Sequence, residues 1–262
     1  MSNLRLAIYQ VDAFSRHVFG GNPAAVVICP EWLPESTMQA IAAENNLAET
    51  AYVVAEEGRF GIRWFTPEVE VPLCGHATLA SAYVLLEHGY AQRAPIEFRC
   101  ESGTLRVSRD GERLALDFPA YQATPLPANP AVGAALGAAP RELHESRGIL
   151  AVYESEAQVR ALRPDFAAVA GLHERAVVAT APGTDADFVS RFFAPQLGVP
   201  EDPVTGSAHC SLIPFWSRRL GRKRLFARQV SARGGELWCE DRGERVTMAG
   251  HAVQYLQGTI TL

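Results

Sequence analysis

The sequence predicts an α+β protein built from two related halves. The stretch at 63–83 has a second version that begins at Arg191 and keeps its register well downstream. The expected strands are short and separated by hairpin turn signals, a pattern typical of mostly antiparallel sheets. Each half also has one helix rich in small residues, at 76–88 and at about 207–220. We therefore expect two pseudo-symmetric domains, each with a sheet and a central helix.

The internal repeat can be followed residue by residue. The first set recurs 128 positions later (191 − 63 = 128): Arg63, Phe65, Pro67, Val71 and Pro72 as Arg191, Phe193, Pro195, Val199 and Pro200. The next turn recurs 131 positions later, with Gly75 and Ala77 as Gly206 and Ala208, so the second copy carries three extra residues (131 − 128 = 3). A third set recurs 132 positions later: Gly103, Leu105, Gly111, Glu112 and Arg113 as Gly235, Leu237, Gly243, Glu244 and Arg245.

Residue patterns place the elements of the first half. Alternation and β-branched runs predict strands at 4–14, 25–28, 50–55, 62–65, 96–99, 104–108 and 113–118. An amphipathic pattern predicts a helix at 34–45 before the small-residue helix at 76–88. A Gly-Gly-Asn-Pro turn is expected just before the strand at 25–28.

Four prolines at 118–132 mark the end of the first half. We expect domains at 1–119 and 128–251 with a linker at 120–127. The second half is expected to contain helices at 130–136, 164–170 and 207–220, strands at 143–144, 148–153, 175–180 and 186–193, strands and a hairpin at 228–248, and a last strand at 252–262.

Composition narrows the class of protein. The 262 residues carry a net charge of −5 without a basic stripe, so we expect no nucleic-acid partner. No apolar run approaches the roughly 20 residues that span a bilayer, and no signal peptide is apparent, which predicts a cytoplasmic protein away from membranes. The five cysteines show neither CxxC nor zinc-ligand spacing, so we expect reduced thiols and no metal. Dinucleotide and P-loop glycine motifs are also absent.

Two glycine turns open helices at equivalent places, at Gly75–His76 and at Gly206–Ser207. Helix N-termini attract anions because their N–H groups are unpaired and the helix dipole is positive there. If the halves face each other, the two turns would clamp a small carboxylate. For either helix alone, an ordinary N-terminal turn is the simpler interpretation, and it is the duplication that favours a ligand site.

Several titratable groups lie near these turns: Cys74, His76, Glu201, Asp202 and His209. Glu49 lies just before a strand; it is either a solvated surface residue or a general acid/base whose pKa is raised by desolvation. The helix dipole should bias His76 towards its neutral form. Asp202 belongs to the three-residue insert of the second copy, where one half would acquire its own chemistry.

Four motifs in order suggest a family. GGNPAAVV, NNLAETAYV, RWFTPEVEVPLCGHATLASA and EDPVTGSAHC together resemble the PhzF-like (phenazine biosynthesis-like) isomerase family. The resemblance implies the diaminopimelate-epimerase-like fold, in which two similar domains each form a barrel-like sheet around a central helix and the site lies between them. That fold allows the strand at 252–262 to pack back on the first domain. It also implies a homodimer that uses no cofactor and no metal.

The resemblance also assigns roles to residues. Glu49 matches the family's catalytic general acid/base, and His76 and Asp202 match its supporting acid/base residues. The turns that hold the substrate carboxylate correspond to Gly75, Gly206 and Ser207, and a polar residue near the site corresponds to Asn22. The family's characterised enzyme isomerises trans-2,3-dihydro-3-hydroxyanthranilate by moving a proton from C3.

Two other functions stay open at this point. Epimerases and racemases of the same fold use one cysteine from each half, and Cys74 lies at the matching place, where a helix N-terminus could lower its pKa. The second turn has no cysteine and Cys210 falls a turn inside the helix, which disfavours a two-thiol racemase but leaves a one-cysteine variant. A non-catalytic protein that binds small carboxylates is the second alternative, although it would not need Glu49, His76 and Asp202 together.

Overall fold

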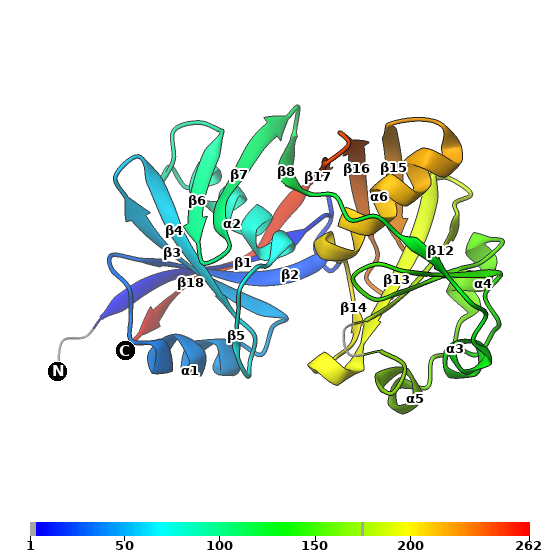
Figure 1. Ribbon diagram of the computed structural model, residues 1–262. Helices are drawn as coiled ribbons and strands as arrows, with labels where there is room; N and C mark the ends of the chain where they lie inside the picture. The colour runs from blue at the N-terminus through cyan, green and yellow to red at the C-terminus, as the bar shows by residue number, and fades with distance from the viewer. Residues whose placement is uncertain (1–3, 174–175) are drawn as a thin grey trace. The chain divides into compact units, whose positions relative to one another are not determined.

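The computed structural model describes residues 4–173 and 176–262. The chain divides into two compact units (Figure 1): unit 1 comprises Met1–Asp117 and Ala249–Leu262, and unit 2 comprises Phe118–Met248. Both units combine strands with a few helices, which confirms the α+β prediction. No helix within the described ranges is long and apolar enough to cross a membrane.

Unit 1 is a curved sheet with a helix at its centre. Its elements are β1 (Arg5–Ala13), β2 (Asn22–Cys29), α1 (Glu35–Asn45), β3 (Glu49–Glu56), β4 (Arg59–Phe65), β5 (Glu70–Val71), α2 (Gly75–Glu87), β6 (Ile96–Cys100), β7 (Gly103–Asp110), β8 (Arg113–Pro119) and β18 (Ala252–Thr261). Helix α2 contacts β1, β2, β3, β7 and β18, and 9 of its 13 residues are buried. A helix enclosed by a sheet needs small side chains, which explains its run of alanine and serine.

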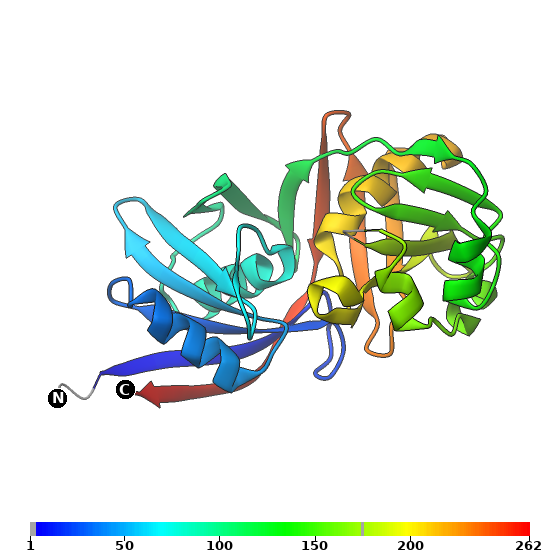
Figure 2. The ribbon, with the colours of Figure 1, turned by 60° about the horizontal axis from the view of Figure 1, so that its bottom comes forward.

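The strand order of unit 1 is β18–β1–β2–β3–β4–β6–β7–β8. Most neighbours are antiparallel, but β2–β3 and β4–β6 are parallel. A parallel pair needs a crossover, and α1 provides the one between β2 and β3 by packing Met38 and Ile41 into a core with Tyr52 and Phe65. Figure 2 shows the C-terminal strand β18 in red beside the blue β1, with which it pairs from Arg5 to Ala13.

Unit 2 repeats this plan. Its elements are β9 (Thr124–Leu126), α3 (Pro130–Leu136), β10 (Glu142–Glu145), β11 (Ile149–Val152), α4 (Glu156–Ala161), α5 (Phe166–Ala170), β12 (Val177–Pro182), β13 (Phe188–Ala194), a 3-10 turn at Pro195–Leu197, β14 (Val199–Asp202), α6 (Gly206–Leu220), β15 (Arg224–Gln229), β16 (Gly235–Asp241) and β17 (Arg245–Gly250). The parallel pairs recur at β11–β12 and β13–β15. Helix α6 corresponds to α2, with 11 of its 15 residues buried.

The recurring arginine and phenylalanine of the sequence repeat make one interaction in each unit. In unit 1, Arg63 donates two hydrogen bonds of 2.6 and 2.5 Å to Glu70 and lies 5.2 Å from the ring of Phe65. In unit 2, Arg191 donates to Glu201 at 2.7 and 2.8 Å, and lies 5.0 Å from the ring of Phe193. Each bidentate pair ties a long strand to the short strand that leads into the central helix.

The structure differs from the sequence-based elements in several places. The expected Gly-Gly-Asn-Pro turn is shorter, because Asn22 and Pro23 already belong to β2 and pair with β1. Residues 120–127, expected as a linker, include β9, which pairs with β10. The short elements β5, α4 and β14 were not predicted, because two to six residues are too few to show a period. Residue 175 of the strand expected at 175–180 lies outside the described residues.

Candidate active site

Four of the residues singled out in the sequence meet at one end of helix α2 in unit 1. Glu49 is the first residue of β3 and Asn22 the first of β2, and these two strands lie side by side in parallel. Cys74 is the N-cap of α2, and His76 is its second residue. Parallel neighbours bring equivalent strand ends to one edge of the sheet, and the enclosed helix begins at that same edge.

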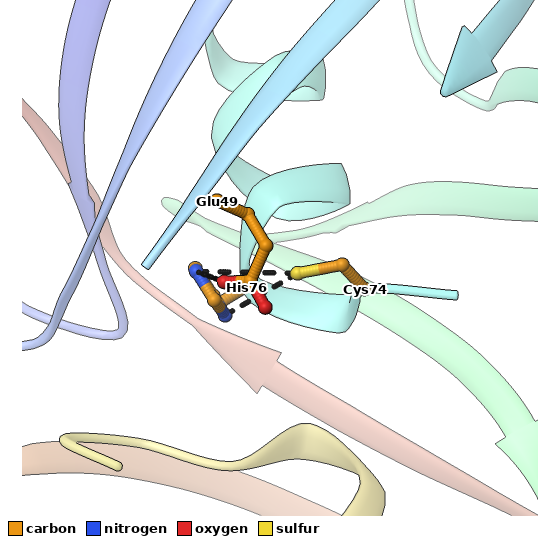
Figure 3. A group of neighbouring side chains, drawn as sticks. All are labelled: Glu49, Cys74 and His76. Atoms are coloured by element: carbon orange, nitrogen blue, oxygen red, sulfur yellow. Dashed lines mark hydrogen bonds and ion pairs between the residues drawn. The ribbon is translucent and has the colours of Figure 1, made fainter. Parts of the chain in front are cut away.

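The side chains form a connected group around His76 (Figure 3). Its Nε2 lies 3.1 Å from Glu49 Oε2. Its Nδ1 lies 3.2 Å from the amide nitrogen of Asn22, which is not drawn in the figure. The Cys74 sulfur is 3.5 Å from Nδ1 and 4.0 Å from Nε2. The imidazole therefore links the carboxylate on one ring nitrogen to the amide on the other.

His76 is held in a form that favours the imidazolium. Burial opposes charge on this ring, but interactions with Cys74 and Glu49 outweigh it and raise the pKa of His76 well above its ordinary value. The expectation that the helix dipole keeps His76 neutral is therefore wrong. It considered only the helix, whereas a carboxylate at contact distance acts more strongly than a partial charge at a helix end.

Cys74 does not have the properties of an activated thiol. Burial, followed by the nearby Glu49 carboxylate, raises the pKa of Cys74 to about 11. This reverses the expectation that the helix N-terminus lowers it. At neutral pH the group is a thiol, so the Glu49 carboxylate is the charge that stabilises protonated His76.

Asn22 lies deeper than a typical ligand contact. Its side chain is fully buried, with 0% exposure, and contacts His76, whereas the Glu49 side chain is 18% exposed to solvent. The outward group of this cluster is therefore the carboxylate. In this structure Asn22 orients the imidazole from behind.

In unit 2 the predicted residues lie on one turn at the start of α6. Asp202 ends β14, and its Oδ2 accepts a hydrogen bond of 2.5 Å from the hydroxyl of Thr205, the N-cap residue. Gly206 is buried and begins the helix, and Ser207 is exposed. Neither Thr205 nor its counterpart Cys74 supplies a side-chain cap hydrogen bond in the described structure, so the first turns of both helices keep N–H groups for an anion.

Gln229, which no sequence motif singled out, holds this turn in place. Its Oε1 accepts from the Thr205 backbone N–H at 2.9 Å, and its Nε2 donates to the Asp202 carbonyl at 2.7 Å and to the Thr205 hydroxyl at 3.1 Å. The side chain is 1% exposed. A glutamine 27 residues from Asp202 (229 − 202 = 27) gives no local signal in the sequence.

Two other titratable residues near the turns are structural. Glu201 is the partner of Arg191 in the duplicated ion pair. His209 is fully buried, its Nδ1 donates to the Thr205 carbonyl at 2.8 Å, and burial lowers the pKa of His209 to about 4. This histidine therefore stays neutral.

The duplication shows what unit 2 has in place of the acid/base group. Thr50 pairs with Phe65 as Val177 pairs with Phe193, which makes Glu49 equivalent to Ala176. By the same register Asn22 corresponds to Ser146, and His76 to Ser207. These small residues line a cavity of about 370 Å³ in unit 2, with walls that include Leu150, Val178 and Phe192 and with Arg147 among its lining residues. In unit 1 this position is occupied by Glu49, Asn22 and His76, whereas in unit 2 the equivalent position is a cavity.

Among the residues that the structure describes, Glu49, Cys74 and His76 carry side-chain atoms of the kinds that bind metal ions. The ligand atoms of Glu49, Cys74 and His76 all lie within 4.8 Å of one another. Sulfur, imidazole nitrogen and carboxylate oxygen together are donors that suit Zn²⁺ better than Mg²⁺ or Ca²⁺.

Comparisons with known proteins agree with this geometry. A family model described as "Phenazine biosynthesis-like protein" matches residues 11–258. An uncharacterized isomerase of Pseudomonas aeruginosa is 55% identical over 260 residues, which cover 99% of this chain and 100% of that protein. The crystal structure of a phenazine biosynthesis protein of the PhzF family from Enterococcus faecalis superposes with a TM-score of 0.97 at 45% identity, covering 99% of this chain and 100% of that one.

A more distant likeness concerns the fold alone. The structure of a predicted epimerase from Pseudomonas aeruginosa has a TM-score of 0.77 at 19% identity and covers 97% of this chain and 99% of that one. The two-unit architecture is therefore the diaminopimelate-epimerase-like fold, as the motifs predicted.

Proposed function

The chain belongs to the phenazine biosynthesis-like isomerase family, and we propose that it moves a proton on a small carboxylate-bearing substrate by acid/base catalysis without a cofactor. The observation that carries this proposal is the contact of 3.1 Å between Glu49 and His76 at the uncapped N-terminus of α2. A carboxylate, an imidazole and unpaired backbone N–H groups in one place are what a carbon acid needs to lose and regain a proton.

Glu49 is the proposed general base. It is the partly exposed member of the cluster, so a substrate C–H can reach it. It removes a proton from an acidic carbon and returns the same proton to another carbon of the conjugated system on the same face. The sum of these two steps is an isomerisation, which consumes no other reactant. A positioned base of this kind contributes on the order of 10²–10⁴ in rate.

His76 is the proposed partner that prepares the base. The raised pKa of His76 keeps a proton on the ring, and the ring holds the carboxylate in one orientation. When Glu49 carries the substrate's proton, the Nε2–H of the imidazolium is proposed to donate a hydrogen bond to the nitrogen or oxygen function of the substrate and to keep its proton. Asn22 contacts Nδ1, and when Nδ1 carries a proton the amide oxygen of Asn22 accepts it after a rotation of the amide, which keeps the ring from turning.

The carboxylate of the substrate is proposed to bind backbone N–H groups at Gly75, Gly206 and Ser207. Both helices lack a side-chain cap at the N-terminal turn, which favours an anion there. Asp202 is proposed to polarise an amino or hydroxyl group of the substrate. Its orientation is fixed by Thr205, and the turn is fixed by Gln229.

The resemblance makes trans-2,3-dihydro-3-hydroxyanthranilate the first substrate to test. It carries a carboxylate, an acidic C–H and a conjugated system, which the proposed groups require. The resemblance also supports a proposed homodimer, which light scattering of the purified chain would test.

The proposed reaction can be tested by proton exchange in D₂O. Small carboxylates with acidic C–H bonds, including the dihydro-hydroxyanthranilate, are incubated with the wild-type protein and followed by NMR. We expect deuterium uptake or isomerisation with at least one compound. The Glu49→Gln variant should lose it, because an amide cannot accept the proton.

A matched control separates chemistry from general damage. Glu44→Gln changes an exposed carboxylate on α1 and should leave exchange unchanged. Exchange that survives Glu49→Gln at the wild-type rate would refute Glu49 as the base and shift the chemistry to His76 or Cys74.

A one-cysteine mechanism is the alternative that the residues left open. The pKa of about 11 at Cys74 argues against it, because the thiolate is the reactive form. Cys74→Ser keeps the volume of the side chain nearly constant and should retain exchange. Abolished exchange in a variant that folds normally would favour the thiol over Glu49.

A further inference from the structure

The geometry of the α2 N-terminus points to an inhibitory site for a thiophilic divalent metal. We propose that Glu49, Cys74 and His76 bind Zn²⁺ and that the bound ion blocks the proposed proton transfer. The inhibition rests on the proposed function of Glu49, whereas the binding does not.

The distances between the donors are close to those of a tetrahedral zinc site. With Zn–N and Zn–O near 2.0–2.1 Å and Zn–S near 2.3 Å, tetrahedral angles place nitrogen and oxygen about 3.3 Å apart and nitrogen and sulfur about 3.6 Å apart. The observed separations are 3.1 Å between His76 Nε2 and Glu49 Oε2, and 4.0 Å between His76 Nε2 and Cys74 Sγ. The carboxylate oxygen and the sulfur lie within 4.8 Å of each other, and the sulfur also lies 3.5 Å from Nδ1, so the Cys74 side chain must turn towards Nε2 to complete the site.

A second observation concerns the other ring nitrogen of His76. Metal-binding histidines almost always hold the nitrogen that does not bind the metal in a hydrogen bond, which fixes the ring and its tautomer. Asn22 lies 3.2 Å from Nδ1 and is fully buried, so it performs this role and leaves Nε2 towards Glu49. When Nδ1 carries the proton, the amide oxygen of Asn22 accepts it after a rotation of the amide.

The charges also balance. A thiolate, a carboxylate and a neutral imidazole carry two negative charges, which Zn²⁺ neutralises in a largely buried place. Two protons leave to the buffer: the thiol proton as the S–H bond breaks and the Zn–S bond forms, and the Nε2 proton of His76 as the Zn–N bond forms. The ion takes the place of the proton between Glu49 and His76, and with three protein ligands zinc takes a water molecule as its fourth ligand.

The consequence for the proposed reaction is inhibition. A carboxylate that is bound to Zn²⁺ cannot accept a substrate proton, and an imidazole bound through Nε2 cannot donate one. Mg²⁺ and Ca²⁺ prefer all-oxygen sites and should not bind here. Zinc is therefore expected to act on this protein as an inhibitor.

Binding is tested first, without reference to activity. Untagged protein is titrated with Zn²⁺ by calorimetry and with Co²⁺ by absorption spectroscopy, in which a sulfur ligand gives a charge-transfer band. We expect one Zn²⁺ per chain and a Co²⁺ band of this kind. Cys74→Ser should abolish the band and weaken Zn²⁺ binding at least tenfold, whereas Cys100→Ser, at a buried cysteine of the same unit outside the group, should change neither.

X-ray absorption on zinc-loaded wild-type protein gives a measurement that needs no variant. One sulfur and three nitrogen or oxygen neighbours are expected. A zinc shell without sulfur, or a Co²⁺ band that persists in Cys74→Ser, would overturn the proposal. In the exchange assay Zn²⁺ should inhibit and a chelator should restore the rate; binding without inhibition would uphold the site and count against Glu49 as the base.

Discussion

Gln229 is the residue whose replacement tests most directly how unit 2 positions Asp202. Gln229→Leu keeps the side chain near its original volume and removes three hydrogen bonds, of 2.9 and 3.1 Å with Thr205 and 2.7 Å with the Asp202 carbonyl. The variant leaves the Thr205 N–H and the Asp202 C=O without that partner. The turn that carries Asp202 should then loosen.

The magnitude follows from burial. A buried backbone group that loses its partner costs about 1–3 kcal/mol. Thr205 is buried and Asp202 is partly exposed, so water can compensate the second group better than the first. We therefore expect the free energy of unfolding to fall by about 2–4 kcal/mol. Urea unfolding monitored by tryptophan fluorescence and by circular dichroism measures this loss.

A matched control is available in the same unit. Gln158 is exposed and its Oε1 accepts one hydrogen bond, from the Glu154 N–H at 2.9 Å. Gln158→Leu should change stability by no more than about 0.5 kcal/mol. A loss below about 1 kcal/mol in Gln229→Leu would refute the argument that this side chain supports the turn. Normal stability with slowed proton exchange would instead give Gln229 a direct role in the reaction.

Three further predictions concern other parts of the fold. The raised pKa of His76 stabilises the folded protein fully below about pH 6.5, the ordinary pKa of histidine in the unfolded chain, and this stabilisation is lost as pH rises through the higher folded-state pKa. The difference in free energy of unfolding between wild type and His76→Asn, measured with urea, should therefore shrink with increasing pH. A difference that grows with pH would refute this. Arg191→Met should lower the stability measured by thermal unfolding by about 2 kcal/mol, and Arg63→Met should lower it by less than about 1 kcal/mol. The Arg191 side chain is 12% exposed and also donates to two backbone carbonyls, whereas the Arg63 side chain is 28% exposed. Equal losses of stability would contradict this. Gly21→Ala should lower the melting temperature far more than Gly58→Ala. Both glycines have positive φ (64° and 73°), but only at Gly21 would an added Cβ meet a backbone oxygen, at 2.1 Å. Similar melting temperatures of the two variants would show that the turn at Gly21 can shift.

The sequence repeat accounts for much of the architecture. Arg63 and Arg191 recur because each closes the same bidentate pair beside a short strand, so the repeat marks a structural unit that was used twice. The helices at 76–88 and 207–220 were predicted to within one residue at each end, because glycine turns and small residues are local signals. The parallel pairs β2–β3 and β4–β6 were not predicted, since pairing depends on which strand the chain returns to.

For the candidate site too, some features follow from the sequence and others only from the tertiary structure. The sequence by itself determined that Glu49, His76 and Asp202 lie in family motifs, and that two helices begin at glycine turns. Only the tertiary structure decided the ionisation of the group. Glu49 and His76 are 27 residues apart (76 − 49 = 27), and their contact of 3.1 Å contributes to the reversed charge of His76. Burial, followed by the nearby Glu49 carboxylate, reverses the expected acidity of Cys74. A pKa is set by the charges and burial around a group in space, and a local stretch of sequence holds only the neighbours along the chain.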